Sequence, residues 1–399
     1  MRTAKPLFAA VATTAALAAV LVASGRLTSA SPGYTLHEWG TFTSVSGSDG
    51  VLLPGLEVEE ETLPSFVYAH DGFASTAKGW ERPIHNATIK METPVIYFYS
   101  NQGFRAHVDV GFEGGSISQW YPDRSGGETP PAADTTDGAI EGGDIDFAET
   151  YRGAIRWDVD VLPPGDYPAW QTFKGDETTT WLLPRQTDAN YVRTATGEQE
   201  KYLFYRGVGN LALPLRTSMP DDGTIRLENR GGARIPFLMV YHLKGDGRVS
   251  FLPVPALDAG GTVDVPVADL DSPRDWHGPV YDTMATALRE AGLFRSEADA
   301  MVQTWWRSYF QSPGTRVFWI VPQEFTERVL PLTARPTPSE RVRVLVGRSE
   351  VLTPAFEREI VTAFEAANKD DNPWQWDRYA DAYAARVMAL TGKRVAPTE

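Results

Sequence analysis

Residues 90–100, KMETPVIYFYS, give the strongest strand signal in the chain, because β-branched and aromatic residues follow one another there. Pro94 has no backbone N–H to donate, so we expect the fully paired part of this strand to begin at Val95. After a short polar turn at 101–103, residues 104–110 alternate between apolar and polar side chains. The pattern predicts a hairpin whose first strand is buried on both faces and whose second strand is buried on one.

Short strands are predicted on both sides of this hairpin, separated by turns that are rich in Gly and Asp. They cover residues 34–45, 117–121, 155–161, 178–183, 202–208, 235–243, 248–254 and 262–267. No helices alternate with these strands, which excludes a series of βαβ units. The spacing is typical of antiparallel sheets that pack as a sandwich or a barrel-like body.

Helical periodicity begins after residue 271, where the composition of the chain changes. Pro near the start and Gly after the end delimit a helix at 279–291, and a second helix is expected from Ser296 to about Phe310. Thr353 and Pro354 are a typical helix start, and a last helix is expected at 374–390. We therefore predict a mainly β fold with an antiparallel β domain at residues 31–270 and a C-terminal α+β domain at 271–399.

The chain has 399 residues, a formal net charge of −15 and no cysteine. An acidic surface argues against nucleic-acid binding, because phosphate contacts need clustered Lys and Arg. The lack of cysteine excludes disulfides, thiolate metal sites, Fe–S clusters and cysteine nucleophiles. The six histidines show no ligand spacing, so the sequence predicts neither a metal site nor a particular cofactor.

The N-terminus has the features of a secretory signal peptide at residues 1–30. Arg2 and Lys5 are followed by an apolar stretch at 7–23, and small residues at 28–30 suit a cleavage site. The mature protein would then begin near Ser31, would have no membrane-spanning segment and would be periplasmic or secreted. The alternative is an uncleaved anchor, for which the apolar stretch is barely long enough.

Residues 125–150 contain Gly, Pro, Thr, Asp and Glu with almost no large apolar side chains. Such a segment cannot bury a core, so we expect an acidic surface loop. Its carboxylates offer ligands for calcium, but their spacing matches no known calcium loop, and a solvated loop is the favoured interpretation.

Glu38 and Glu92 are acids in strands that otherwise read as buried, and Lys201 and Arg206 are bases near the ends of such strands. A buried charge costs several kcal/mol unless it is paired, so we expect these acids and bases to meet. The favoured interpretation is a structural ion-pair network. The alternative is that Glu38 or Glu92 is a catalytic carboxylate with a raised pKa.

Arg105, His107 and Asp109 share one face of the strand at residues 104–110, because side chains two residues apart on a strand point the same way. They could bind a ligand, although a solvated strand face is the simpler interpretation. His37 is adjacent to Glu38, but neighbouring residues on a strand point to opposite faces. No nucleophile elbow, phosphate-binding loop or dinucleotide fingerprint is present.

Four segments together carry a resemblance to a group of exported bacterial proteins of unknown function. They are HEWGTFT at 37–43, METPVIYFY at 91–99, FYRGVG at 204–209 and GRSEVLTP at 347–354. The resemblance extends over nearly the whole expected mature chain. It implies export and a β-rich body, and it carries over no catalytic residues.

The sequence therefore favours an exported cell-envelope or secreted protein that binds a glycan or another envelope component. Its 12 tryptophans include some that could stack on sugar rings, although most are expected to fill cores. The alternative is an extracytoplasmic hydrolase acting on a polymer, with Glu38 or Glu92 as general acid or base. Exposed aromatic side chains without paired carboxylates would favour binding, whereas two carboxyl groups facing one cleft would favour hydrolysis.

Overall fold

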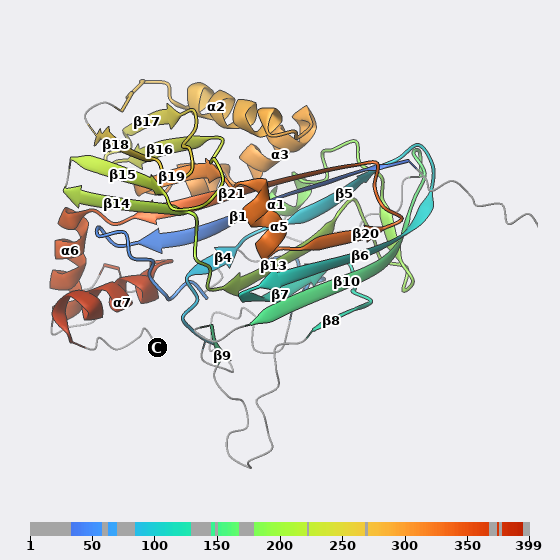
Figure 1. Cartoon of the computed structure of the whole chain (residues 1–399), viewed down its shortest axis with the longest axis horizontal. Helices are drawn as coiled ribbons and strands as arrows, with labels where there is room; N and C mark the ends of the chain where they lie inside the picture. The colour runs from blue at the N-terminus through green and yellow to red at the C-terminus, as the bar shows by residue number, and fades with distance from the viewer. Residues whose placement is uncertain are drawn as a thin grey trace, which may run out of the picture. The chain divides into compact units, whose positions relative to one another are not determined.

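Strands from the whole length of the chain assemble into one large mixed sheet, shown in Figure 1. The computed structural model describes residues 33–57, 63–69, 84–128, 145–147, 151–166, 179–221, 223–267, 270–366, 373–374 and 377–393. The expected signal peptide and most of the acidic loop lie outside the described residues. Among the described residues, no helix is long and apolar enough to span a membrane.

The large sheet has ten strands in the order β17-β16-β19-β21-β1-β4-β13-β7-β2, with β5 paired to β1 and β13. Their bounds are β1 Thr35–Ser46, β2 Tyr68–Ala69, β4 Ile89–Met91, β5 Val95–Tyr99, β7 Gly115–Tyr121, β13 Leu203–Gly209, β16 Leu238–Leu243, β17 Val249–Val254, β19 Gly314–Ile320 and β21 Glu340–Val351. All described pairs in it are antiparallel except β1 with β21, which is parallel over its whole length.

Smaller sheets complete the β structure. A six-stranded sheet has the order β12-β11-β10-β6-β20 with β8 paired to β10, a three-stranded sheet has the order β14-β15-β18, and β3 pairs with β9. The bounds are β3 Ile84–His85, β6 Phe104–Glu113, β8 Gly126–Glu128, β9 Ile145–Asp146, β10 Arg152–Val161, β11 Val192–Thr194, β12 Gln199–Glu200, β14 Leu215–Asp221, β15 Thr224–Asn229, β18 Thr262–Pro266 and β20 Leu332–Arg335.

The helices lie mainly in the C-terminal part of the sequence. They are α1 Thr179–Leu182, α2 His277–Glu290, α3 Arg295–Thr304, α4 Trp306–Phe310, α5 Gln323–Val329, α6 Pro354–Glu365 and α7 Ala380–Thr391. Helices α2 to α4 cover one face of the ten-stranded sheet, where their apolar side chains pack on β16 and β19. Helices α6 and α7 pack on each other near the end of β21, through Leu352, Ile360 and Val387. The predicted mainly β fold with antiparallel sheets and C-terminal helices is confirmed.

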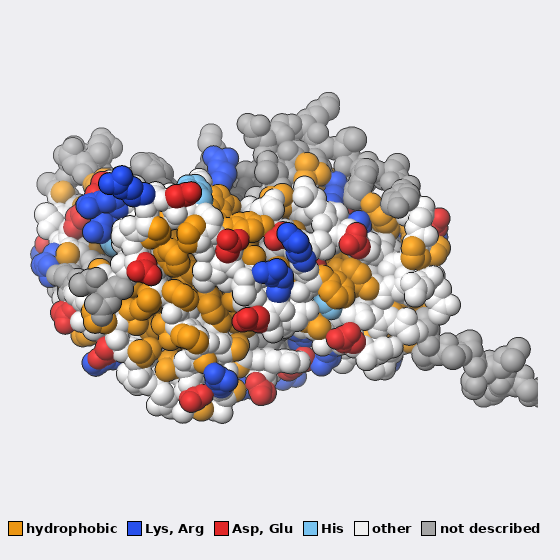
Figure 2. Space-filling model, turned by 90° about the horizontal axis from the view of Figure 1, so that it is seen from above, with side chains coloured by type: hydrophobic (Ala, Val, Ile, Leu, Met, Phe, Trp, Pro, Cys, Tyr) orange, Lys and Arg blue, Asp and Glu red, His pale blue; other side chains and the backbone are white. Residues whose placement is uncertain are grey.

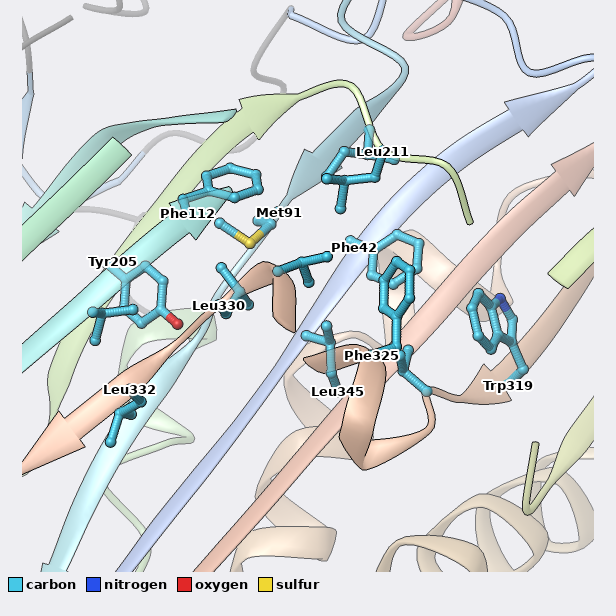
Figure 3. Packing of buried hydrophobic residues seen from close by; sticks show 14 of the residues in the cluster. Phe42, Met91, Phe112, Tyr205, Leu211, Trp319, Phe325, Leu330, Leu332 and Leu345 are labelled. Carbon is cyan, nitrogen blue, oxygen red and sulfur yellow. The ribbon is translucent and has the colours of Figure 1, made fainter. Parts of the chain in front are cut away.

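The largest hydrophobic core lies between the ten-stranded sheet and the smaller sheets. Figure 3 shows part of it, with Phe42 of β1, Met91 of β4 and Trp319 of β19 among the packed side chains. Because side chains alternate along a strand, the neighbours of these residues point to the opposite face, towards the helices. There, Phe318 and Tyr309 belong to a second core. The central strands are therefore buried on both faces.

The predicted hairpin at residues 95–110 is wrong in its pairing, although its burial pattern is confirmed. β5 pairs with β1 and β13, whereas β6 pairs with β10 and β20, so the turn joins two different sheets. Phe98 and Phe104 meet across the sandwich, with their ring centroids 6.3 Å apart. In this arrangement the apolar faces of β5 and β6 pack against each other in the main core, and this burial stabilises the fold.

Three other expectations differ from the structure. The segment expected as a strand at 178–183 contains the short helix α1, and the long helix expected from Ser296 is divided into α3 and α4. The ten-stranded sheet also crosses the domain boundary that was expected at residue 270. It contains β19 and β21 from the expected C-terminal domain together with β1 from the expected N-terminal domain. Which strands share this sheet is determined by pairing between segments that are far apart in the sequence, and local periodicity carries no information on such pairing.

Candidate functional site

A row of polar side chains crosses the helix-covered face of the ten-stranded sheet. On neighbouring strands, Lys90 lies opposite Thr43, and Thr43 lies opposite Arg348. Arg316 of β19 lies opposite Glu350 of β21, two residues beyond Arg348 and therefore on the same face. Together with Glu92, the charged members Lys90, Arg316, Arg348 and Glu350 form what we call the buried charge network. Each of these five residues is buried.

Two arginines share one carboxylate at the end of this row. Arg348 Nε donates to Glu350 Oε1 over 2.7 Å, and Arg316 Nε lies 3.1 Å from the same oxygen. Burial acts to raise the pKa of Glu350, but the positive charges of Arg316 and Arg348 outweigh it and hold this pKa below its ordinary value. Glu350 is therefore ionised at neutral pH.

Gly347 allows this arrangement of β21. A Cβ atom at this position would lie 2.3 Å from Nε1 of Trp319, which fills the opposite core. Trp319 Nε1 instead donates to Ser349 Oγ over 3.2 Å. The strand can thus bury a large indole on one face of the sheet while it carries Arg348 and Glu350 on the other.

Glu92 lies at the other end of the network. Thr43 donates a hydrogen bond of 2.7 Å to Glu92 Oε1, and the Tyr309 hydroxyl donates one of 3.1 Å to Oε2. Burial acts to raise the pKa of Glu92, but Lys90 and Arg348 outweigh it, so this pKa is lower than usual. The carboxylate is therefore held in its charged form.

The expected partners of Glu92 were Lys201 and Arg206, and that pairing is wrong: no ion pair joins them among the described residues. Lys201 Nζ donates to the carbonyl of Thr187, and Arg206 Nε donates to Gln119 on β7. The expectation that a buried acid would meet a buried base is confirmed, but the bases come from β4 and β21.

Glu38 lies on the other face of the sheet from Glu92, so these two acids do not share a site. Arg343 Nε donates to Glu38 Oε2 over 2.5 Å, and the Tyr205 hydroxyl donates to Oε1 over 2.7 Å. Glu38 and Arg343 lie opposite each other on β1 and β21. This buried group is a cross-strand ion pair inside the main core.

His37 is also paired within the protein. Its Nδ1 lies 2.7 Å from Glu297 Oε2 on α3, and the Tyr99 hydroxyl donates to Glu297 Oε1 over 2.9 Å. Both His37 and Glu297 are buried. The contact joins β1 to the helical layer.

Arg105, His107 and Asp109 do share a face of β6, as predicted, and they pair with charged residues of β10. His107 lies between two carboxylates, with Nε2 2.9 Å from Asp109 and Nδ1 2.6 Å from Asp158. Arg105 pairs with Asp160 over 3.0 Å. The row is therefore a partly exposed ladder of ion pairs between two strands, which contribute little stability each.

A pocket of about 530 Å³ opens at the end of the ten-stranded sheet where β16, β19 and β21 meet α6 and α7. The buried charge network reaches it through Arg316, Arg348 and Glu350, which form part of its lining. Aromatic side chains line it as well. The ring centroid of Phe356 lies 4.8 Å from that of Trp374 and 5.3 Å from that of Tyr383. The pocket thus combines aromatic walls with charged groups supplied by the sheet.

Two further titratable groups line this pocket. Burial raises the pKa of Asp377 above its usual value. Burial lowers the pKa of His242, and the nearby charges of Lys244 and Arg316 act in the same direction. His242 Nδ1 lies 2.8 Å from the hydroxyl of Thr315. At neutral pH His242 is therefore uncharged, and Asp377 takes up a proton more readily than an ordinary aspartate.

A second pocket, of about 550 Å³, lies at another place and includes Lys201, Tyr99 and Asp188 in its lining. Its lysine is half-buried, and desolvation lowers the pKa of this group. Among the described residues, its lining contains three tyrosines but no tryptophan and no member of the buried charge network. We therefore take the pocket beside Arg348 as the candidate functional site. Among the described residues, no group of three or more His, Asp or Glu side chains is placed to hold a metal ion.

Sequence reasoning missed Arg316, Arg348 and Glu350. Arg348 and Glu350 are charged residues spaced two apart in an apolar strand, the same signal that identified His107 and Asp109. Arg316 stands before an apolar run at residues 317–321 and shows no comparable pattern. The aromatic wall could not be recognised, because Phe356, Trp374 and Tyr383 come from separate segments.

No family model matches the chain, and no curated protein is similar to it in sequence. Among solved structures, it is similar to the Fcho1 mu-homology domain of Danio rerio with a bound Eps15 peptide, at 8% identity and a TM-score of 0.28. That match covers 81% of this chain and 96% of that chain. It is also similar to the yeast delta-COP-I mu-homology domain complexed with a Dsl1 WxWxV peptide, at 8% identity and a TM-score of 0.27. Here the match covers 80% of this chain and 98% of that chain. Values this low support no inference about function.

Proposed function

We propose that the pocket beside Arg348 binds a glycan of the cell envelope, in an exported protein. The observation that carries this proposal is the combination of aromatic walls and fixed polar groups in one pocket. Small-ligand sites usually have volumes of about 300–1,000 Å³ and combine apolar walls with a few placed polar groups. Aromatic rings can pack against the C–H faces of a sugar, while charged and hydrogen-bonding groups receive its hydroxyls.

The charged side of the pocket supports the same proposal. Arg316, Arg348 and Glu350 are held by the sheet and by each other, so their positions are set before a ligand arrives. Burying three charges is costly, and an apolar replacement of similar size is often as stable or more stable. A preorganised polar surface that faces a pocket is consistent with ligand recognition.

A glycan array tests this proposal. We expect the wild-type chain to bind at least one class of glycan, and we expect Trp374→Ala to reduce that binding about tenfold or more, because the ring provides the contact surface. Phe294→Ala is the matched control, since Phe294 is an exposed aromatic residue that does not line the pocket. Absence of binding to every glycan class, or equal binding by the Trp374 variant, would contradict the proposal.

Export is part of the proposal and is supported by the basic start, apolar stretch and small-residue site at residues 1–30. N-terminal sequencing of the protein from its native host should find a mature chain that begins near Ser31. Recovery of the chain with Met1 in the membrane fraction would instead support an anchor.

Hydrolysis of the bound glycan is the second candidate function, and one observation favours it. Glu350 and Asp377 both line the pocket, and their environments move their pKa values in opposite directions. Such a difference suits a general base and a general acid in glycoside hydrolysis. Asp377 would protonate the leaving oxygen, and Glu350 would accept a proton from the attacking water. Release of reducing ends by the wild type, and its loss in Asp377→Asn, would support hydrolysis over binding alone.

A further inference from the structure

We propose that the ligand of this pocket carries an anionic group, which binds to the guanidinium of Arg348. This inference rests on the proposed glycan site and specifies the class of glycan: an acidic one, with a carboxylate, phosphate or sulfate. The proposal comes from the charges around the pocket and from the hydrogen bonds of Arg348.

The charge balance of the pocket differs from that of the chain. The whole sequence has a formal net charge of −15. Among the described residues that line the pocket, the cations are Lys244, Arg316, Arg348 and Arg378, and the acids are Glu350, Glu359 and Asp377. The cations thus outnumber the acids by four to three, and the buried environment of Asp377 favours its neutral form. A positive pocket in an acidic protein attracts anions selectively.

The two terminal nitrogens of Arg316 are engaged by the protein itself. Its Nη1 donates to the carbonyl of Tyr309 and to Ser312 Oγ, and its Nη2 donates to the carbonyls of Ser312 and Pro313. Its Nε lies 3.1 Å from Glu350 Oε1 as an ion pair, without a hydrogen bond among the described residues. The contacts of Nη1 and Nη2 tie the end of α4 to β19, so both terminal nitrogens of Arg316 are used within the protein.

Arg348 differs from Arg316 in having a terminal nitrogen without a hydrogen-bond partner among the described residues. Its Nε and Nη2 both contact Glu350 Oε1, at 2.7 and 2.5 Å. Its buried Nη1 has no hydrogen-bond partner among the described residues. The side chain is 1% exposed, and its guanidinium lies 4.6 Å from the ring centroid of Tyr309. A buried donor without a partner is costly, and an anionic ligand would satisfy it.

The single carboxylate of Glu350 also leaves positive charge uncompensated. Two buried arginines contact the same oxygen of Glu350, which gives this part of the pocket two positive charges against one negative charge. Glu92, the next buried acid, is shared between Arg348 and Lys90. An anion bound at Arg348 would offset the excess of positive charge beside Glu350.

The test is a glycan array that contains neutral, carboxylated, and phosphorylated or sulfated glycans with related backbones. We expect the acidic glycans to bind about tenfold or more tightly than their neutral counterparts, because a hydrogen bond between charged groups is strong. The carboxylated and the phosphorylated or sulfated sets distinguish the source of the anionic group. Arg348→Gln should weaken binding of acidic glycans more than binding of neutral glycans and so remove most of this preference.

Lys244→Gln is a second variant, because Arg348→Gln could impair folding. Lys244 is exposed at the edge of the pocket, so its replacement should leave the fold intact and weaken binding of acidic glycans only. Lys393→Gln, an exposed lysine that pairs with Glu365 outside the pocket, is the matched control. Equal binding of neutral and acidic glycans, still lost in Trp374→Ala, would overturn this inference and leave the glycan site in place. Failure to bind any glycan would instead contradict the proposed function.

Discussion

Arg316 and Glu350 face each other across β19 and β21, and Arg316 Nε lies 3.1 Å from Glu350 Oε1. This contact links the structural row of charges in the sheet to the pocket beneath α6 and α7. Since the pair belongs to two adjacent strands, its geometry is set by the ladder and not by a loop.

Glu92→Gln should destabilise the protein by about 3–5 kcal/mol, because removal of one partner leaves buried cations without compensation. Lys90 and Arg348 are the cations concerned. Chemical denaturation would measure the loss as a lower midpoint with an unchanged dependence on denaturant concentration.

Glu113→Gln is the matched control, since Glu113 pairs with Arg152 over 2.8 Å at an exposed edge of β6. An exposed pair contributes about 0–1 kcal/mol, so this change should have a small effect. If Glu92→Gln melted at or above the wild-type temperature, a structural role for Glu92 would be excluded and a catalytic role favoured.

Tyr205→Phe should cost about 1.5–3 kcal/mol, because its hydroxyl donates to the charged Glu38 over 2.7 Å inside the main core. Tyr34→Phe provides the comparison, since the Tyr34 hydroxyl donates to the uncharged carbonyl of Pro336. That change should cost about 0.5–1.5 kcal/mol. Equal losses in both variants would mean that the charge of Glu38 adds nothing to its hydrogen bond.

Thr353→Ala should destabilise the protein by about 0.5–2 kcal/mol, because the Thr353 side chain caps α6. It accepts a hydrogen bond of 3.0 Å from the backbone N–H of Phe356, which lines the pocket. Thr353→Ser keeps the capping oxygen and should retain most of the stability. A serine variant as unstable as the alanine variant would argue against capping as the cause.

The stability of the protein should depend on His242 as the pH falls from about 7.5 to 5. The pKa of His242 is lowered in the folded state, so the unfolded chain binds a proton at a higher pH than the folded chain does. The contribution of His242 is therefore complete above its unfolded pKa, about 6.5, and is lost as the pH falls towards its folded pKa.

Comparison with His242→Asn isolates this effect. Burial also raises the pKa of Glu57 to about 7, but this group titrates in both proteins and its effect cancels in the difference. Melting temperatures should fall more steeply with acidification in the wild type than in the variant. Parallel curves would show that His242 does not contribute to the pH dependence.

Local sequence patterns predicted where strands and helices form better than they predicted which strands pair. The burial of β5 on both faces and the start of α6 at Thr353 and Pro354 follow from residue type and spacing alone. The pairing of β5 with β1 does not, since it joins residues about 60 positions apart and competes with the nearby β6. The same holds for the parallel pairing of β1 with β21.

The candidate site was harder to predict than the fold. Acids in apolar strands indicated buried pairs, and Glu38 and Glu92 are indeed paired, but their partners Arg343 and Arg348 lie on β21, far along the chain. The four segments that carry the resemblance fall on β1, β4 with β5, β13 and β21, which lie together in the sheet. The pocket itself depends on side chains from five elements, which no local pattern brings together.

The exposed apolar side chains do not mark the candidate functional site. Figure 2 shows one face of the molecule, where hydrophobic side chains gather in a patch bordered by single acidic and basic groups. Among the described residues, the exposed large hydrophobic side chains are Val51, Tyr68, Leu182, Phe294, Met388 and Leu390. They come from separate parts of the sequence, and none of them lines the pocket beside Arg348. The candidate site is identified by the side chains that line its pocket and not by an exposed apolar surface.

The position of a bound glycan tests the central claim most directly. A crystal structure of the complex with the glycan that binds best on the array would show it. We predict that the sugar packs between the ring of Trp374 and the guanidinium of Arg348, with its acidic group on Arg348. A glycan bound instead in the pocket beside Lys201, or anywhere outside the pocket beside Arg348, would contradict the account.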